Sequence, residues 1–201
     1  WQYPVFTDTR DPATAALNAW IRTQAVQLLL APSPLATQAL HLTDRELIAR
    51  AAVDRDFVDS GVDQAVWLPG AALGRYRAIE GYSEYVGGSH PVHRVKARLY
   101  DMRRREERAL RDLFRLDAQD KLEDLYDAQK KQDDAHPCEF RHFDWSSAAL
   151  AAPDTLGFEY PYEPGHGVEC DDIVVKGRAV ARLLKSPREL APVFQLVADK
   201  P

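Results

Sequence analysis

The chain has 201 residues, of which 45% are hydrophobic and 28% are charged. This composition supplies enough apolar side chains for a folded core and excludes an intrinsically disordered chain. There are 26 basic and 31 acidic residues, which give a formal net charge of -5. Every apolar run is shorter than the roughly 20 residues of a membrane-spanning helix. We therefore expect a soluble domain that does not bind nucleic acid.

The first 60 residues are predicted to form two helices. After Asp11-Pro12, apolar residues at three- and four-residue spacing predict a helix over 13–30. Thr43-Asp44-Arg45-Glu46 has the form of a capping box, in which a hydroxyl and a carboxylate bind the first free amides of a helix. A second helix is therefore expected over 44–57, with an apolar stripe formed by Leu47, Ile48, Ala51 and Ala52.

Alternating apolar residues beyond position 60 predict a sheet. Strands are expected over 75–86 and 92–101, and the glycine turn between them makes them antiparallel neighbours. Helical spacing then predicts a helix over 118–132. The other expected elements are strands over 155–160 and 172–176 and a short helix over 178–184.

These elements predict an α+β fold, in which N-terminal helices are followed by an antiparallel β-sheet with an inserted helix and a short C-terminal helix. No linker divides the chain, so we expect one domain over 1–201. Residues 1–60 would be its mainly helical subregion, and residues 61–201 its sheet-containing subregion.

A known family shares several motifs with this sequence. Tyr82-Ser83-Glu84-Tyr85-Val86-Gly87-Gly88-Ser89-His90-Pro91 is followed by Leu99-Tyr100-Asp101 and by Leu110-Arg111-Asp112-Leu113-Phe114. In this order the motifs resemble the exported domain of unknown function found in the anti-sigma factor RsiV and in the non-catalytic part of the peptidoglycan deacetylase PdaC. The chain departs from the family pattern at 102–108, which lacks the usual glycine of a hairpin turn.

The resemblance implies an exported α+β domain without catalysis, periplasmic or otherwise extracytoplasmic. Such domains are anchored in the envelope by a lipid or a membrane helix, which we expect to precede this chain. In RsiV the ligand is lysozyme, a cationic muramidase, and an acidic chain would be attracted to such a partner.

We therefore expect a non-enzymatic domain that binds a protein partner, either a cell-wall hydrolase or a secreted toxic effector. It would act as an inhibitor, an immunity protein or a sensor. The alternative is an accessory module that binds peptidoglycan or another envelope ligand beside a cell-wall enzyme.

The first candidate partner-binding site is the glycine turn formed by Gly87, Gly88, Ser89 and His90. Its glycines allow the positive φ of a tight reversal, and the turn could present a binding edge. Two other interpretations are a purely structural turn and a metal site built on His90 and His93.

The second candidate site is the aromatic loop that contains Tyr160, Tyr162, Glu163 and His166. Tyrosines held between prolines offer contact area at a low entropic cost, which suits a protein interface. The same tyrosines could instead pack on the core while the glycines turn the chain.

The two cysteines, Cys138 and Cys170, form an even count that favours one disulfide in an oxidising compartment. Such a crosslink would staple the long irregular stretch between them. The alternative is a Cys2His2 zinc site that also uses His142 and His166.

Two groups of charged residues are expected to form solvent-exposed surfaces. The carboxylates at 159, 163, 169, 171 and 172 suit a solvated face better than a glycosidase pair. The arginines between 103 and 115 predict a solvated surface with local ion pairs, and contact with phosphate or anionic lipid is the alternative. No nucleophile or nucleotide motif is present, so we expect no catalytic residue, no cofactor and no metal.

Overall fold

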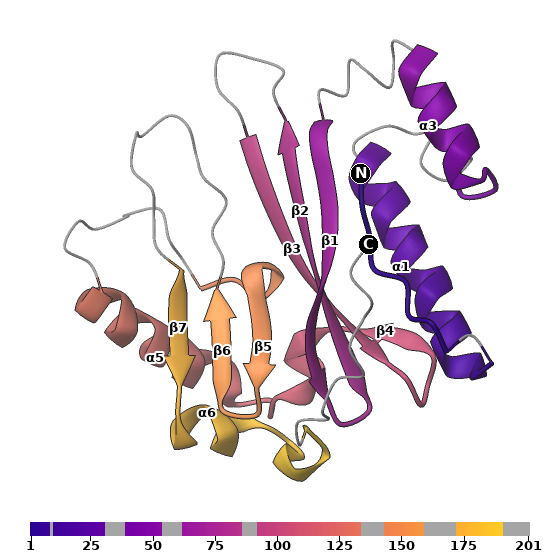
Figure 1. Cartoon of the computed structure of the whole chain (residues 1–201). Helices are drawn as coiled ribbons and strands as arrows, with labels where there is room; N and C mark the ends of the chain where they lie inside the picture. Colours follow the sequence, from indigo (N-terminus) through magenta and orange to yellow (C-terminus); the bar gives the residue numbers. More distant parts are fainter. Residues whose placement is uncertain are drawn as a thin grey trace.

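The computed structural model describes residues 1–8, 10–30, 39–53, 62–85, 92–133, 143–158 and 172–190. The elements up to residue 108 are α1 (Pro12–Leu30), α3 (Asp44–Val53), β1 (Val62–Leu73), β2 (Tyr76–Tyr85), β3 (Val92–Asp101) and β4 (Glu106–Arg108) (Figure 1). They are followed by the 3-10 turn η1 (Leu110–Leu113), α5 (Ala118–Asp133), η2 (Trp145–Ser147), β5 (Ala148–Ala152), β6 (Thr155–Phe158), β7 (Ile173–Lys176), α6 (Arg178–Leu183) and η3 (Pro187–Leu190).

The predicted α+β class is confirmed. The strands form two antiparallel sheets, with the orders β1-β2-β3-β4 and β5-β6-β7. The helices predicted over 13–30 and 118–132 correspond to α1 and α5, and the strands predicted over 75–86 and 92–101 correspond to β2 and β3. The later predictions correspond to β6, β7 and α6.

Three strands were not predicted, each for a local reason. β1 contains Pro69 and Gly70, and its register with β2 shifts between Pro69 and Ala72. β4 consists of three charged residues, Glu106 to Arg108. β5 has the sequence Ala-Ala-Leu-Ala-Ala, whose intrinsic preference is helical.

The predicted stripe on the second helix is partly wrong. Leu47 is fully buried, whereas Ile48 is 58% exposed. Of the two, only Leu47 contacts the core, where it packs with Val26, Leu30 and Ala39 in a small apolar cluster. Residues 54–57 of the predicted helix, and the side chains of Ala51 and Ala52, lie outside the described part of the chain.

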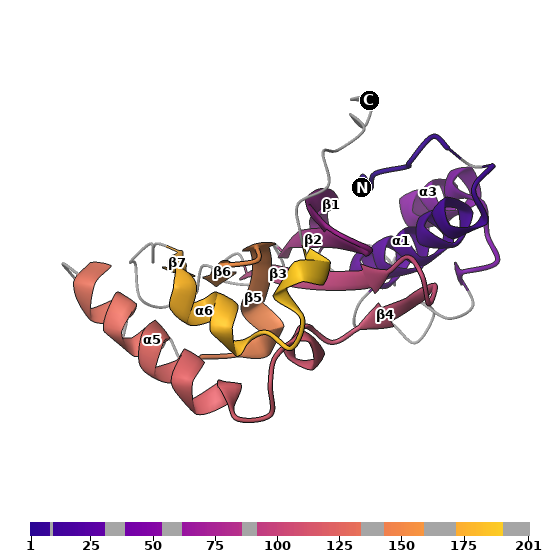
Figure 2. The same ribbon diagram turned by 90° about the horizontal axis from the view of Figure 1, so that it is seen from below.

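Two layers cover opposite faces of the four-stranded sheet. Seen from below, α1 and α3 lie at one end of the molecule and α5 at the other, with the strands between them (Figure 2). Because side chains alternate along a strand, each sheet face has its own core. The face toward α1 contributes Trp67, Ile79 and Tyr100, which pack on Leu17 and Ile21. The other face contributes Tyr76, Ala78 and Leu99, which pack with Leu150, Leu156 and Phe158 of the three-stranded sheet.

Gly81 of β2 makes room for the Trp67 side chain of β1. A Cβ atom at Gly81 would lie 2.7 Å from carbons of the Trp67 ring. The absence of a side chain at this position therefore lets the indole pack against the neighbouring strand, where Trp67 is 2% exposed.

Asp101 organises the turn between β3 and β4. Its fully buried carboxylate accepts hydrogen bonds through Oδ1 from the backbone amides of Arg103 (2.9 Å) and Arg104 (3.1 Å). Its Oδ2 lies 3.1 Å from Nε of Arg75, an ion pair without hydrogen-bond geometry. Arg105 adopts φ +59°, so an arginine takes a left-handed conformation in this turn, whose residues 102–108 include no glycine.

The N-terminal segment lies along β1. The Gln2 amide donates to the Ala65 carbonyl (3.0 Å), and the Trp67 amide donates to the Gln2 carbonyl (2.9 Å). The Trp1 indole also donates to the Ala25 carbonyl of α1 (3.0 Å). The start of the chain is thus joined to the outer edge of β1 and to α1.

Candidate functional site

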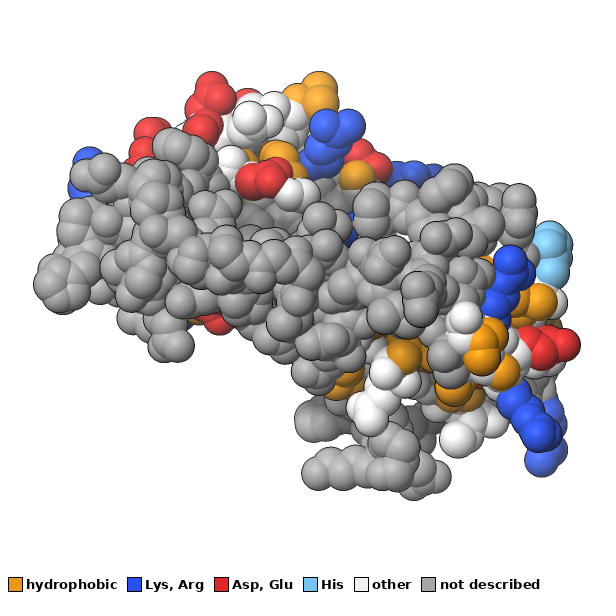
Figure 3. Space-filling view, turned by 90° about the horizontal axis from the view of Figure 1, so that it is seen from above, with side chains coloured by type: hydrophobic (Ala, Val, Ile, Leu, Met, Phe, Trp, Pro, Cys, Tyr) orange, Lys and Arg blue, Asp and Glu red, His pale blue; other side chains and the backbone are white. Residues whose placement is uncertain are grey.

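The residues predicted to contact a partner all lie outside the described residues. This applies to Gly87, Gly88, Ser89 and His90 in the glycine turn, and to Tyr160, Tyr162, Glu163 and His166 in the aromatic loop. It applies equally to Cys138 and Cys170, and to His142 of the alternative zinc site. Figure 3 views the molecule from above and colours the described side chains by type, and these sites are not among them. Both predicted sites and the disulfide remain predictions.

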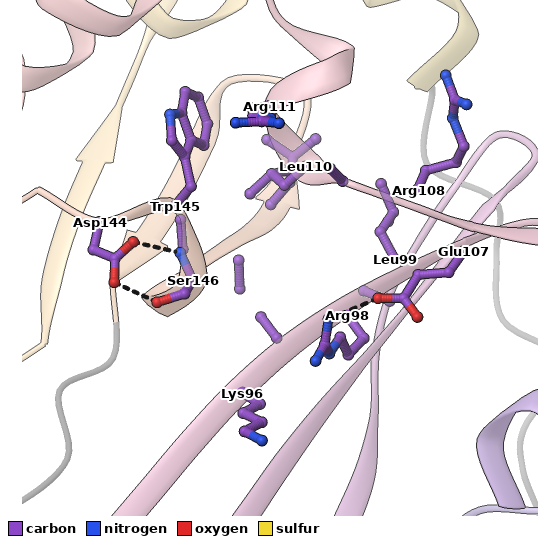
Figure 4. A pocket seen from close by; sticks show the side chains of 16 residues that line it. Lys96, Arg98, Leu99, Glu107, Arg108, Leu110, Arg111, Asp144, Trp145 and Ser146 are labelled. Carbon is purple, nitrogen blue, oxygen red and sulfur yellow. Dashed lines mark hydrogen bonds and ion pairs between the residues drawn. The ribbon is translucent and has the colours of Figure 1, made fainter. Parts of the chain in front are cut away.

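The described residues instead form a groove between the two sheets. Its volume is about 590 Å³, and it lies between the β3 side of the large sheet and the η2–β5 segment of the small one (Figure 4). The lining consists of Ala78, residues 96–99, residues 107–111, residues 144–146 and residues 148–150. We call this site the inter-sheet groove.

Alanine and leucine side chains form the apolar part of the groove. Ala78, Leu99 and Leu150 line it and are also members of the buried core between the sheets. Small side chains such as Ala97 and Ala149 leave a hollow where larger ones would close the gap. The groove is thus continuous with the hydrophobic core between the sheets, and no described side chain fills it.

Glu107 lies at the margin of the groove, and its carboxylate is turned toward α1, on the side of the sheet that carries Tyr100. Its Oε1 accepts from Nη1 of Arg98 (2.8 Å), and its Oε2 accepts from Nε1 of Trp20 (3.2 Å) and Nε2 of Gln24 (3.4 Å). These contacts join β3, β4 and α1, and Trp20 also packs on Tyr100 with ring centroids 4.9 Å apart. Glu107 and Arg98 are therefore held in place before any ligand binds.

Trp145 and Asp144 fix one wall of the groove. The Asp144 carboxylate caps η2 by accepting from the Ser146 amide (2.9 Å) and from the Ser146 hydroxyl. The Trp145 ring lies 5.2 Å from both Phe114 and Phe143, which belong to or border the core. Figure 4 shows Trp145 and Arg111 on one side of the groove and Lys96 and Arg98 on the other.

The lining carries an excess of positive charge in an acidic protein. Its basic residues are Lys96, Arg98, Arg108 and Arg111, against the acidic residues Glu107 and Asp144. Arg108 forms two ion pairs, from Nη1 to Oε1 of Glu106 (3.4 Å) and from Nη2 to Oδ2 of Asp112 (3.8 Å). Arg111 is exposed and forms no ion pair with the described residues. The predicted local ion pairs of the arginine cluster are thus confirmed, and they include Arg104 with Glu106 and Arg115 with Asp117.

Glu80 lies beside the groove on β2, opposite Ala97 in the register with β3. Burial raises the pKa of its carboxyl group. The Oε1 atom of Glu80 also lies close to Gly70, where a Cβ atom would come within 3.0 Å of it.

The groove combines apolar lining residues with a few polar groups held in place by hydrogen bonds. Within the described residues, no three His, Cys, Asp or Glu side chains gather as metal ligands would. None of the described helices is long and apolar enough to cross a membrane.

Sequence reasoning missed the groove because its lining comes from five separate segments. The arginines and Glu107 were noticed only as a charged run, and Trp145 lies in a stretch without a periodic pattern. One local signal was available, since Asp144-Trp145-Ser146 places a capping residue directly before an aromatic one. That signal predicts a fixed tryptophan, although it does not predict what the ring faces.

No protein-family model and no curated protein matches the chain. Among solved structures, a structural neighbour is a member of the DUF3298 family from Bacteroides fragilis. The two chains are 12% identical, the TM-score is 0.47, and the alignment covers 85% of this chain and 76% of that chain.

Proposed function

We propose that this chain is an exported, non-catalytic binding domain that recognises a cell-wall hydrolase of the lysozyme type or a secreted toxic effector. It blocks or senses its partner sterically, as an inhibitor, an immunity protein or a sensor in the cell envelope. The motif resemblance to the RsiV-like and PdaC-like domains supports the exported, anchored setting.

The inter-sheet groove is the observation that supports a binding role most directly. Arg98 is paired with Glu107, Asp144 is held as the cap of η2, and Trp145 is held by ring contacts with Phe114 and Phe143. A surface whose side chains are already ordered loses little entropy when a partner binds. The groove therefore has the preorganisation expected of a protein-binding surface.

The test is calorimetric titration of the protein with a panel of purified secreted muramidases and effectors, and separately with soluble glycan strands. Ala149→Trp and Ala109→Trp each place an indole in the groove, and we expect either to weaken partner binding at least tenfold. Ala151→Trp is the matched control, because Ala151 is exposed on the same strand as Ala149 but does not line the groove.

Two results would contradict the proposal. Binding to glycan strands with no hydrolase or effector bound would favour the accessory-module alternative. Hydrolase binding that both groove variants leave unchanged would remove the groove from the interface. Circular dichroism of each variant establishes that the fold is retained before binding is compared.

A second candidate function is peptidoglycan binding beside a catalytic domain. Trp145 supports it, because a fixed, half-exposed indole next to hydrogen-bonding groups suits a ligand that has both apolar and polar surfaces. The glycan arm of the titration tests this candidate directly.

A further inference from the structure

Among the described residues, the edge of the large sheet beside the groove is unpaired before Leu99. β4 pairs with Leu99, Tyr100 and Asp101, and no other described strand pairs with β3 on that side. A strand edge presents backbone N–H and C=O groups to any extended chain that lies beside it. The part of β3 that precedes Leu99 therefore lines the groove with strand backbone, and residues 96–98 belong to that lining.

The small sheet forms the other side of the same space. β5 is an edge strand of its sheet and pairs with β6 alone among the described strands. Its residues Ala148, Ala149 and Leu150 line the groove. The groove therefore has residues of the edge strand β3 on one side and residues of the edge strand β5 on the other, an arrangement that could receive an extended peptide.

The charges indicate the chemistry of that peptide. Glu107 is neutralised by Arg98, and Asp144 is occupied as the cap of η2. Arg111 is the exposed lining guanidinium that has no ionic partner among the described residues, and it lies beside Trp145 on the groove wall (Figure 4). A guanidinium in this position complements a carboxylate, to which it can donate two parallel hydrogen bonds.

We propose that the inter-sheet groove binds an extended, carboxylate-bearing peptide segment of the partner protein, which lies along the open edge of β3 and places its carboxylate on Arg111. The apolar side chains that alternate with the carboxylate pack against the alanines and leucines of the groove. This inference rests on the proposed binding function and specifies the part of the partner that is bound.

The experiment is a selection from a library of randomised seven-residue peptides, with the folded Ala149→Trp variant as the counter-selection. We expect selected peptides to be enriched in Asp or Glu and depleted in Pro, because proline cannot supply a strand N–H. Fluorescence anisotropy then measures each selected peptide against its Glu→Gln or Asp→Asn counterpart. Loss of one charge-assisted hydrogen bond should weaken binding about tenfold or more.

Arg111→Gln should reduce binding of the acidic peptide to that of its amide counterpart and leave the amide peptide nearly unaffected. Arg115→Gln is the matched control, because Arg115 pairs with Asp117 and does not line the groove. The binding free energies of the Arg111→Gln variant and the amide peptide should therefore not be additive. A general loss of positive charge from the protein would not produce this non-additivity.

Several outcomes would overturn the inference. They are selected peptides rich in proline or basic residues, equal effects of Arg111→Gln and Arg115→Gln, and no enrichment over the Ala149→Trp counter-selection. Binding of glycan strands in place of peptides would also overturn it. If the muramidase and effector panel binds through the groove while peptide selection fails, the proposed function stands and only the extended-peptide inference falls.

Discussion

Arg105 is the residue whose backbone conformation conflicts most with its side chain. It adopts φ +59° in the β3–β4 turn, a region that is disfavoured by about 1 kcal/mol or more for residues with a Cβ atom. We expect Arg105→Gly to raise the free energy of unfolding by about 1 kcal/mol, measured by urea denaturation.

Arg104→Gly provides the comparison within the same turn. Arg104 is exposed and does not have a positive φ, so glycine there adds freedom to the unfolded chain and removes only an exposed ion pair with Glu106. It should lower the free energy of unfolding by about 0.5 kcal/mol. Equal effects of the two substitutions would show that the left-handed conformation carries no cost at Arg105.

Residue-scale prediction from the sequence succeeded where a feature spans only a few positions. The capping box at Thr43 could be predicted because its contacts join residues three apart, and the Thr43 and Glu46 side chains bind each other's backbone amides. The left-handed conformation of Arg105 could not be predicted in this way. The turn that contains it is held by the buried Asp101, which in turn pairs with Arg75 from the β1–β2 turn.

At the scale of elements, α3 depends on its N-terminal cap. The Glu46 amide donates to the Thr43 hydroxyl (3.3 Å), and the Thr43 amide donates to the Glu46 carboxylate (2.7 Å). Thr43→Ala should lower the free energy of unfolding by about 1 kcal/mol, measured by chemical denaturation at pH 7. The control is Thr155→Ala on β6, which removes a threonine hydroxyl that does not cap a helix. Thr14→Ala would not serve, because the Thr14 hydroxyl donates to Asp11 at the start of α1.

The same cap should weaken in acid. Hydrogen bonds from the Thr43 hydroxyl and amide lower the pKa of Glu46 below its ordinary value. A lowered folded-state pKa adds stability above the unfolded pKa, and this stability is lost as the pH falls through the lowered folded value. Glu46→Gln should therefore flatten the acid side of the stability profile, and an unchanged slope would contradict the assignment.

Elements with a clear period were predicted well, and those without one were missed. α1 and α5 bury one face each, so their apolar spacing is visible in the sequence. β5 buries Ala148 and Leu150 and exposes Ala151, a strand alternation that alanine hides because it suits either environment. Tertiary pairing with β6, rather than local preference, makes this segment a strand.

At the scale of the whole molecule, the two sheets share one core, so they should unfold together. Leu150 of β5 is 3% exposed and belongs to the cluster that contains Tyr76, Ala78 and Leu99 of the large sheet. Leu150→Ala should destabilise the protein by about 3 kcal/mol and shift a single calorimetric transition to lower temperature. Val174→Ala, at a 40% exposed position on β7, should have a small effect.

Two separate transitions, only one of them shifted by Leu150→Ala, would contradict the expectation of one domain over 1–201. Such a result would make the inter-sheet groove a boundary between independent units. The order of the elements other than β1, β4 and β5 was predicted from the sequence, whereas this junction was not, because its contacts join residues from Leu73 to Leu190.

The two sides of the large sheet differ in a way that limits self-association. Gln2 already occupies the margin of β1 at Ala65 and Trp67, so a foreign strand cannot run along it past that point. Filaments that grow by pairing of edge strands need two unpaired sheet edges on every copy, because each copy must pair with a copy on either side. Copies that meet through the β3 edge of the large sheet would therefore close as a two-fold dimer, whereas the edge strands β5 and β7 of the small sheet are not subject to this restriction.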